Sequence, residues 1–419
     1  MKMERISAWL MVCALPLAVA CGGEPAQEEE EPVVLEEPEC TSNAECEGNE
    51  AGPLCLELEQ KCAPAPIGGV IGWGDGTPES VDIVTIYENT APATIEATDL
   101  GFHKERDELW ILNRRPFVAG ACAESNPGSA RCTSLPGYTV TISNPGKADQ
   151  SERVAQDGNA WHFMRRPPAI AMGNNDLFGT CGEVATGNFE DNDVMFMGPS
   201  LWSSSDDIYA RPSGKNGSHM DMLHATPWCV GMAHEVDNVY WVFNGHVGSI
   251  DRYDFNEDHG PGEADHSDGE VRRYAEGTLS RVDHVPGHME YLDGWVYVAD
   301  TGNGRVVKLD TSSGEATGDF APIYEPLAES NQMANAMVMD VVAPGSLTRP
   351  SGLAIHDDLL YVSDNATGKM HAFDLDGQEV RTLDTGLGAG VLGGIEVGPD
   401  GKMWFTNLTN GSVYRIDVK

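Results

Sequence analysis

The feature that most constrains this chain is an internal repeat. Residues 285–310 align without a gap on residues 349–374, and residues 241–254 and 404–417 fall into the same register over fourteen columns. The first column is always aromatic, the last is always Asp, and the eighth is always glycine, at Gly248, Gly304, Gly368 and Gly411. Such self-similarity indicates a repeat architecture, in which each copy is one small structural unit.

Each copy predicts a β-hairpin with a third strand ahead of it. Apolar and polar residues alternate on both sides of a short connection that ends in the eighth-column glycine, where a positive φ is expected. Another short apolar run precedes each hairpin. Three strands and a more variable fourth make one blade of a β-propeller. The segments YVADTGNGRVVKLD (297–310) and RPSGLAIHDDLLYVSD (349–364) resemble blades of the NHL-repeat family.

We therefore predict an all-β fold, a six-bladed NHL-like β-propeller over residues 80–419. Four blades are clear, and two more are expected around Trp110 and Phe178; the irregular first half leaves five or seven blades open. The last blade stops after its third strand at Val418, so an early strand at 82–87 could complete it and remove the exposed sheet edges. Segments 120–150 and 183–222 are expected to be insertions that could plug the channel.

The N-terminal region predicts export to a bacterial cell envelope. Residues 1–20 have the layout of a signal peptide, with Lys2 and Arg5 ahead of an apolar run too short to span a membrane comfortably. Residues 17–21 resemble a lipobox, which would make Cys21 the lipidated first residue and the membrane a partner through the lipid anchor; ordinary cleavage is the alternative. Gly22 favours the outer membrane. The acidic residues 21–39 are expected to form a disordered tether.

The cysteines are expected to form disulfides, as in exported proteins. Residues 40–62 form a short segment that cannot build a hydrophobic core and whose spacing lacks the CxxC pairs of zinc sites. Two disulfides are expected among its four cysteines, and elimination pairs the remaining cysteines of the propeller as two further bonds. The residues concerned are Cys40, Cys46, Cys55 and Cys62, then Cys122 with Cys132 and Cys181 with Cys229.

The net charge and the absence of recognisable catalytic motifs in the sequence favour a ligand-binding function. The formal net charge of −40 argues against nucleic acid as a partner. Phosphate-binding loops and catalytic motifs of common hydrolases do not stand out. We expect a module that binds an unknown protein or small-molecule ligand through the channel face of the propeller. The alternative is a metal-dependent lyase or hydrolase with a His-lined site at the mouth, and a purely structural envelope role is the third possibility.

Six histidines are expected on one face of the propeller, where inter-blade connections meet the hairpin loops. Imidazoles from different blades could hold zinc or copper, or they could line a hydrated mouth. The preferred metal ligands are His162, His224 and His288, with His246 in reserve. His103, His234 and His356 recur just after first strands and are interpreted as repeat features. Peptidyl-hydroxyglycine lyases are similar propellers that hold zinc through Pro-His motifs; here His288 stands one place later, so no catalytic residue is transferred.

Three further groups of residues are candidates for binding or catalysis. Arg165, Arg166 and Arg349 precede first strands and could hold a carboxylate or phosphate, or pair with local acids. Glu290 follows His288 and could be a metal ligand, a general base or a pore-lining acid. Asp254, Asn256 and Asp258 have the spacing of a calcium loop, although an ordinary acidic turn would use the same residues.

Overall fold

The structure is a computed structural model that describes residues 40–46, 48–56, 61–89, 96–114, 136–186, 195–212, 215–263 and 265–419. The expected signal peptide, Cys21, the expected acidic tether and the expected Cys122–Cys132 disulfide lie outside these residues. The chain divides into two compact units, Met1–Ala63 and Pro64–Lys419. Among the described residues, no helix reaches the length and apolarity that a membrane crossing requires.

The first unit is held together by cysteines. It contains the 3₁₀ helix η1 (Asn43–Cys46) and a hairpin of β1 (Leu54–Leu56) and β2 (Lys61–Ala63). Disulfides join Cys40 to Cys55 and Cys46 to Cys62, and these four buried cysteines form the apolar centre of the segment. Disulfide bonding therefore replaces the hydrophobic core that so short a segment cannot build.

The second unit is a six-bladed β-propeller, as the repeat predicted. The first two blades are four-stranded sheets, and the second is preceded by the short helix α1 (Ala160–Phe163). The strands of blade 1 are β4 (Glu96–Phe102), β5 (Glu108–Arg114), β6 (Tyr138–Ser143) and β7 (Ser151–Ala155). Those of blade 2 are β8 (Ile170–Met172), β9 (Leu177–Thr180), β10 (Ser200–Ser203) and β11 (His219–Met222).

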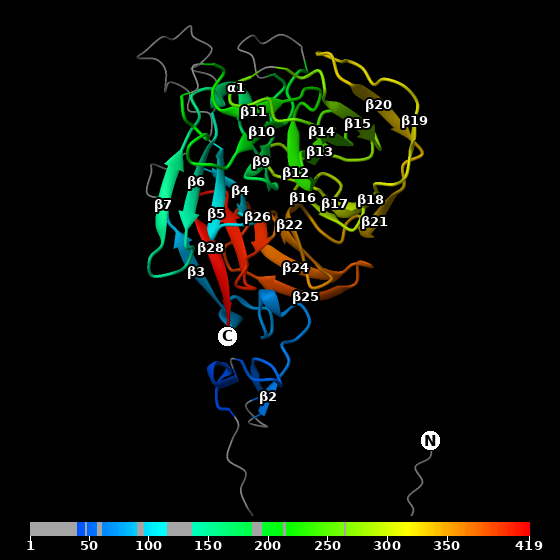
Figure 1. Cartoon of the computed structure of the whole chain (residues 1–419). Coiled ribbons are helices and arrows are strands. Elements are labelled where there is room, and N and C mark those ends of the chain that lie inside the picture. The colour runs from blue at the N-terminus through cyan, green and yellow to red at the C-terminus, as the bar shows by residue number, and fades with distance from the viewer. Residues whose placement is uncertain are drawn as a thin grey trace, which may run out of the picture. The chain divides into compact units, whose positions relative to one another are not determined.

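Blades 3 and 4 share an excursion of the chain. Blade 3 contains β12 (Cys229–Val236), β13 (Val239–Asn244), β14 (Ser249–Asp254) and β15 (Glu270–Tyr274). Blade 4 contains β16 (Met289–Leu292), β17 (Trp295–Asp300), β18 (Arg305–Asp310) and β21 (Val338–Val342). Between β18 and β21 the chain forms β19 (Glu315–Ala316) and β20 (Glu329–Ala334), and β20 pairs in parallel with β15 at the edge of blade 3 (Figure 1).

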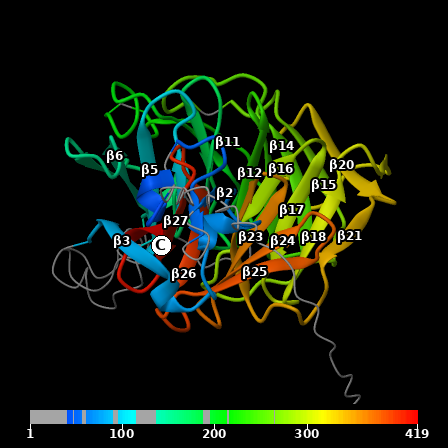
Figure 2. The same ribbon diagram turned by 90° about the horizontal axis from the view of Figure 1, so that it is seen from below.

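The last two blades include the closure of the ring. Blade 5 contains β22 (Pro350–His356), β23 (Leu359–Asp364), β24 (Lys369–Asp374) and β25 (Glu379–Asp384). Blade 6 contains β26 (Leu392–Val397), β27 (Met403–Asn407), β28 (Val413–Val418) and, from the start of the unit, β3 (Val81–Tyr87). The pairing of β28 with β3, red beside blue in Figure 1, confirms the predicted closing strand. Figure 2 shows the sheet of blade 4 from below.

Described parts of the segments 120–150 and 183–222 belong to the blade sheets: they supply β6 to blade 1 and β10 and β11 to blade 2. Residues 64–80, which lie outside the predicted propeller range, contain η2 (Gly69–Ile71) and η3 (Pro78–Ser80) and pack on blade 5. The Arg381 side chain donates to the carbonyls of Ile67 and Gly74 at 3.1 and 3.2 Å.

The hydrophobic core is divided among the six seams between neighbouring blades. Each seam has its own cluster of buried side chains, and the last joins blade 6 to blade 1. The first-column aromatics are buried in these clusters. The inner strands β4, β8, β12, β16, β22 and β26 contact one another in ring order, with β26 against β4. A central channel between these six strands follows from this order.

Candidate functional site in the central channel

The inner strands of all six blades line one cavity of about 300 Å³. Apolar residues such as Leu100, Met172 and Ile395 line part of its wall, but polar atoms make up most of the surface that faces the cavity. Six ionisable side chains interrupt this wall: Asp99, Lys104, His234, His288, Glu290 and Glu396. A small cavity with a few convergent polar groups is the usual form of a ligand site.

Strand register explains why carboxylates gather in the channel. The inner-strand residue opposite the first-column aromatic is small in three blades, namely Gly101, Ala233 and Ala354. In blades 4 and 6 the same position is occupied by Glu290, opposite Tyr297, and by Glu396, opposite Trp404. The propeller therefore places the two glutamates at one level of the channel.

A second level lies two residues earlier along the inner strands. It contains Asp99 from blade 1 and His288 from blade 4, whereas blade 6 has Gly394 there. A Cβ atom on Gly394 would lie 2.3 Å from Asp99 Oδ1 and 2.9 Å from His288 Cε1. Glycine at this position therefore makes room for the aspartate and the histidine.

Asp99 and His288 are held in place from several sides. Asp99 accepts hydrogen bonds from the backbone N–H groups of Ile170 at 2.8 Å and Leu100 at 2.9 Å. His288 Nε2 lies 3.2 Å from the Pro168 carbonyl oxygen, and its Nδ1 lies 3.4 Å from Asp99 Oδ1. Burial raises the pKa of Asp99 well above its usual range and lowers the pKa of His288 to about 4. A neutral imidazole whose Nε2–H donates to Pro168 therefore presents an Nδ1 lone pair to Asp99.

The two glutamates have a strong electrostatic tendency to stay protonated. Burial raises the pKa of Glu396 to about 8, and the charge of Asp99 adds to the effect. Burial and the charges of Glu396 and Asp99 raise the pKa of Glu290 well above its usual range. Lys104 acts in the opposite direction on both glutamates. Three carboxyl groups thus share a space in which their combined ionisation is unfavourable.

Lys104 and His234 supply the basic groups at the C-terminal ends of the inner strands. Lys104 Nζ lies 2.9 Å from His234 Nδ1 and 3.3 Å from Asn174 Oδ1. Burial, followed by the charge of Lys104, lowers the pKa of His234 to about 4, and burial also lowers the pKa of Lys104. His234 lies near the end of inner strand β12, where the repeat placed it, and it also lines the cavity.

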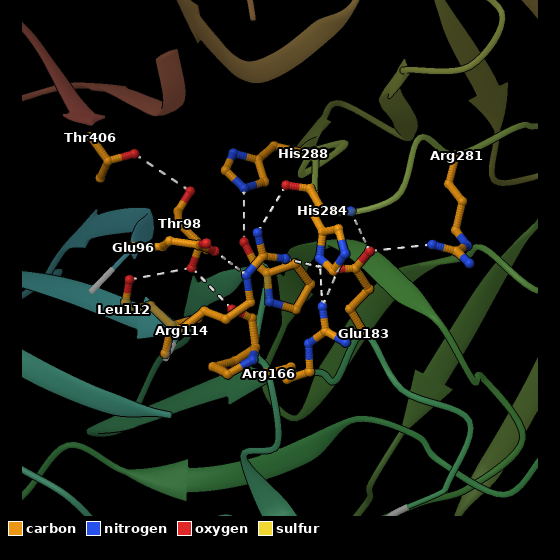
Figure 3. A network of polar contacts seen from close by, with 12 residues as sticks. Glu96, Thr98, Leu112, Arg114, Arg166, Glu183, Arg281, His284, His288 and Thr406 are labelled. Carbon is orange, nitrogen blue, oxygen red and sulfur yellow. Dashed lines mark hydrogen bonds and ion pairs between the residues drawn. The ribbon is translucent and has the colours of Figure 1, made fainter. Parts of the chain in front are cut away.

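The N-terminal ends of the inner strands carry a buried network of ion pairs. Arg114 contacts Glu183, and it donates to Glu96 at 2.7 Å and to the His284 carbonyl at 2.8 Å (Figure 3). Arg281 contacts Glu183 from the connection before blade 4. Blades 1 and 4 are opposite in a six-bladed ring, so these bonds bridge the channel. Arg114 and Glu183 are only 2% and 1% exposed, so the central ion pair of this network is buried.

The three arginines chosen from the sequence make local contacts. Arg166 contacts the His284 imidazole, as Figure 3 shows, and burial lowers its pKa. Arg165 donates to the Thr186 carbonyl at 2.9 Å, and the Arg349 backbone N–H donates to Asp364 at 3.1 Å. Their role as an anion site stays a prediction.

The structure does not bring the four chosen histidines together. His288 lies in the channel, whereas His246 is exposed in the hairpin between β13 and β14. His162, on α1, packs edge-on against Phe163, and His224 contacts Glu325 from the excursion between blades 4 and 3. Among the described residues, potential ligand atoms converge within 4.8 Å in two groups: Cys40 with Cys46 and Cys62, and Asp221 with His259 and Asp268. Neither group contains any of the four histidines.

The candidate calcium residues form a hydrogen-bonded turn. Asp254 Oδ1 accepts the backbone N–H of Asn256 at 3.0 Å, and Asp254 Oδ2 lies 3.8 Å from Arg252. The Asn256 side chain donates to the Asp268 carbonyl at 2.7 Å, and burial raises the pKa of Asp258. These contacts match the acidic-turn alternative, and calcium there stays a prediction.

Asp99, Lys104 and Glu396 are ionisable channel residues that the sequence interpretation missed. Of the three channel carboxylates only Glu290 was selected, because it lies beside His288. The signal for Glu396 is found by comparing, from blade to blade, the inner-strand residue opposite the first-column aromatic. This residue is glycine or alanine in blades 1, 3 and 5 and glutamate in blades 4 and 6. Asp99 is harder to find, because a register shift between Ala97 and Asp99 interrupts β4.

Comparisons with known proteins add only distant structural similarity. No protein-family model and no curated protein matches the sequence. A protein of unknown function from Bacteroides thetaiotaomicron is 12% identical with a TM-score of 0.48, covering 81% of this chain and 76% of its own. Regucalcin, a calcium-binding protein from Agrobacterium tumefaciens, is 9% identical with a TM-score of 0.47, covering 81% and 94%. Virginiamycin B lyase from Staphylococcus aureus is 10% identical with a TM-score of 0.44, covering 81% and 100%. These values are too low to transfer an activity or a ligand.

Proposed function

We propose that this protein binds a small organic cation in its central channel. The observation that carries the proposal is the presence of three carboxyl groups, Asp99, Glu290 and Glu396, in one cavity of about 300 Å³. Burial raises the pKa of each. A bound ammonium group would favour the ionised forms of these carboxyl groups and would donate charge-assisted hydrogen bonds to them. A small cation is therefore complementary in charge to these three carboxyl groups.

The spacing favours an ammonium group over a bare metal ion. Asp99, Glu290, Glu396 and His288 do not form a group whose ligand atoms converge within 4.8 Å. An N–H···O bond of about 2.9 Å lets one ammonium bridge oxygens that lie too far apart for one ion. Leu100, Met172 and Ile395 offer apolar contact to a carbon skeleton. At the other end, Lys104 would suit an anionic group on a zwitterionic ligand.

The proposal also includes the cellular location of the protein. We infer an NHL-type propeller exported to the bacterial envelope and anchored through Cys21, so that the channel meets ligands outside the cytoplasm. The disulfides of both compact units support this, because such bonds persist in oxidising compartments. The signal-like residues 1–20 and the acidic segment 21–39 support it as well.

A second candidate function follows from the interaction between Glu290 and Glu396. The charge of Glu396 raises the pKa of Glu290, and burial raises the pKa of both, so the two can be present as one acid and one base, the pair that proton-transfer catalysis uses. A metal-dependent lyase or hydrolase is less well supported. It would need His162, His224 and His288, or His246 in place of one of them, to converge on one ion, and no converging group among the described residues contains them.

Calorimetric titration tests the binding proposal. Methylamine, choline, putrescine and γ-aminobutyrate would be compared with neutral and anionic molecules of the same size. We expect the cations to bind wild-type protein and the Glu152→Gln control, whose carboxyl is exposed on β7. Glu290→Gln and Glu396→Gln should each weaken binding by at least about tenfold, as loss of a charged partner predicts. Equal heats from cations and neutral molecules, or unchanged affinity in both channel variants, would refute the proposal.

A further inference from the structure

A second polar cluster lies outside the channel, on the seam between blades 2 and 3. Asp221 belongs to β11, the outer strand of blade 2. His259 and Asp268 belong to the connection between β14 and β15 of blade 3. The connection is attached to β11, since the Gly262 N–H donates to the His219 carbonyl at 2.8 Å. Potential ligand atoms of Asp221, His259 and Asp268 all lie within 4.8 Å of one another.

Asp221 is the unusual member of this cluster. It is 1% exposed, and its Oδ1 accepts the Met222 N–H at 2.6 Å and lies 2.8 Å from His266 Nδ1. Its Oδ2 is buried and has no hydrogen-bond partner among the described residues. A buried carboxylate oxygen without a partner is strongly unfavourable, because nothing replaces its lost hydration. A cation beside Oδ2 would remove this deficit.

The other two members of the cluster contact each other. His259 Nε2 lies 2.9 Å from Asp268 Oδ1, and Asp268 Oδ2 accepts the Glu257 N–H at 3.1 Å. One imidazole and two carboxylates are ligands that zinc accepts at about 2.0–2.2 Å, a geometry in which ligand atoms lie about 3–4 Å apart. His266 is placed to orient Asp221, as residues behind metal ligands commonly do. Calcium, which prefers oxygen ligands, fits this set less well.

We propose that Asp221, His259 and Asp268 bind one divalent transition-metal ion, with Zn²⁺ the best match. The ion would join the β14–β15 connection of blade 3 to the outer strand of blade 2. The same two blades are linked nearer the channel by the disulfide between Cys181, next to β9, and Cys229, in β12. Three protein ligands leave a fourth zinc position for water, and the site lies apart from the channel and does not depend on the channel ligand.

Metal binding to the full chain tests this inference. Chelator-treated protein would be titrated with Zn²⁺ and with Ca²⁺ in a calorimeter, and its metal content measured by mass spectrometry after dialysis. We expect about one Zn²⁺ per chain and much weaker Ca²⁺ binding. His259→Gln and Asp221→Asn should each weaken Zn²⁺ binding by at least about tenfold. Zn²⁺ should also raise the unfolding temperature of the wild type and not of these variants.

Matched controls distinguish the site from the other histidines and from the channel. His371 contacts Glu379 at 2.6 Å in blade 5, a His–carboxylate pair that belongs to neither converging group. His371→Gln and the channel variant Glu290→Gln should therefore bind Zn²⁺ like the wild type. If Asp221→Asn fails to fold, His259→Gln decides the outcome, because His259 lies on a partly exposed connection. Absence of stoichiometric Zn²⁺, or unchanged binding in His259→Gln, would overturn the inference.

Discussion

Replacing Glu396 by glutamine should change how the stability of the propeller depends on pH. In the wild type, burial and the charge of Asp99 raise the pKa of Glu396 from its ordinary 4.5 to about 8. The folded state therefore holds a proton that the unfolded state has already lost between these pH values. Stability from this group is fully present below about pH 4.5 and declines as the pH rises through about 8. Glutamine cannot ionise, so Glu396→Gln should lose this decline.

The pKa shift sets an upper limit on the size of the effect. A rise from 4.5 to about 8 corresponds to roughly 5 kcal/mol, at about 1.4 kcal/mol for each pH unit. Lys104 offsets part of the charge, and the cavity has room for water, so the effective dielectric is well above that of a dry interior. We therefore expect wild type to lose about 1–3 kcal/mol more than Glu396→Gln between about pH 5 and about pH 9.

Urea unfolding at several pH values, followed by tryptophan fluorescence, measures this difference. Glu152→Gln is the matched control, because Glu152 is exposed on β7 and should follow the wild-type curve. Parallel curves for wild type and Glu396→Gln over the whole range would refute the reasoning. So would a wild type that gains stability relative to the variant as the pH rises.

Three further predictions concern other parts of the propeller. The Cys181→Ala/Cys229→Ala double variant should unfold with about 2–4 kcal/mol less free energy, because the bond closes a loop of 48 residues between blades 2 and 3; an unchanged urea midpoint would contradict this. Gly304→Ala should destabilise the fold by about 2 kcal/mol or more, since φ is 62° and the new Cβ would lie 2.6 Å from a carbonyl oxygen. Gly401→Ala, with φ 70° and open space, should lose about half as much in the same assay, and equal losses would exclude the steric contribution. Burial lowers the pKa of His288 to about 4, so the stability contributed by the neutral imidazole is present above about pH 6.5 and is lost as the pH falls toward 4. In thermal melts, His288→Gln should therefore lose less stability on acidification than the wild type.

The fold could be predicted because the repeat imposes the same local rules several times. Gly248, Gly304, Gly368 and Gly411 all have positive φ values, from 62° to 74°, as the hairpin pattern required. The lone strand at 82–87 completes blade 6, as the missing fourth strand implied. Blade 2 was harder to predict from the sequence, because a long connection separates β10 from β11 and neither strand matches the columns of the repeat.

The candidate sites were less predictable because each joins residues from different blades. Glu396 looks like one polar residue of an alternating strand until its column is compared with Glu290 and with the small residues elsewhere. Nothing in the sequence pairs Arg114 with His284, which are 170 positions apart across the ring. Asp221 likewise meets His259 only because the β14–β15 connection folds back on blade 2. The spacing of residues in the sequence does not by itself predict any of these contacts.

The most direct test of the channel account is the number of protons released when a small amine binds. Calorimetric titration at about pH 7, repeated in buffers that differ in ionisation enthalpy, gives this number. Because burial holds Asp99, Glu290 and Glu396 toward their protonated forms, a bound ammonium should expel about one proton or more per ligand. The release should fall in Glu396→Gln. Binding without proton release, or with the same release in Glu396→Gln, would contradict the proposal that these carboxyl groups hold the ligand.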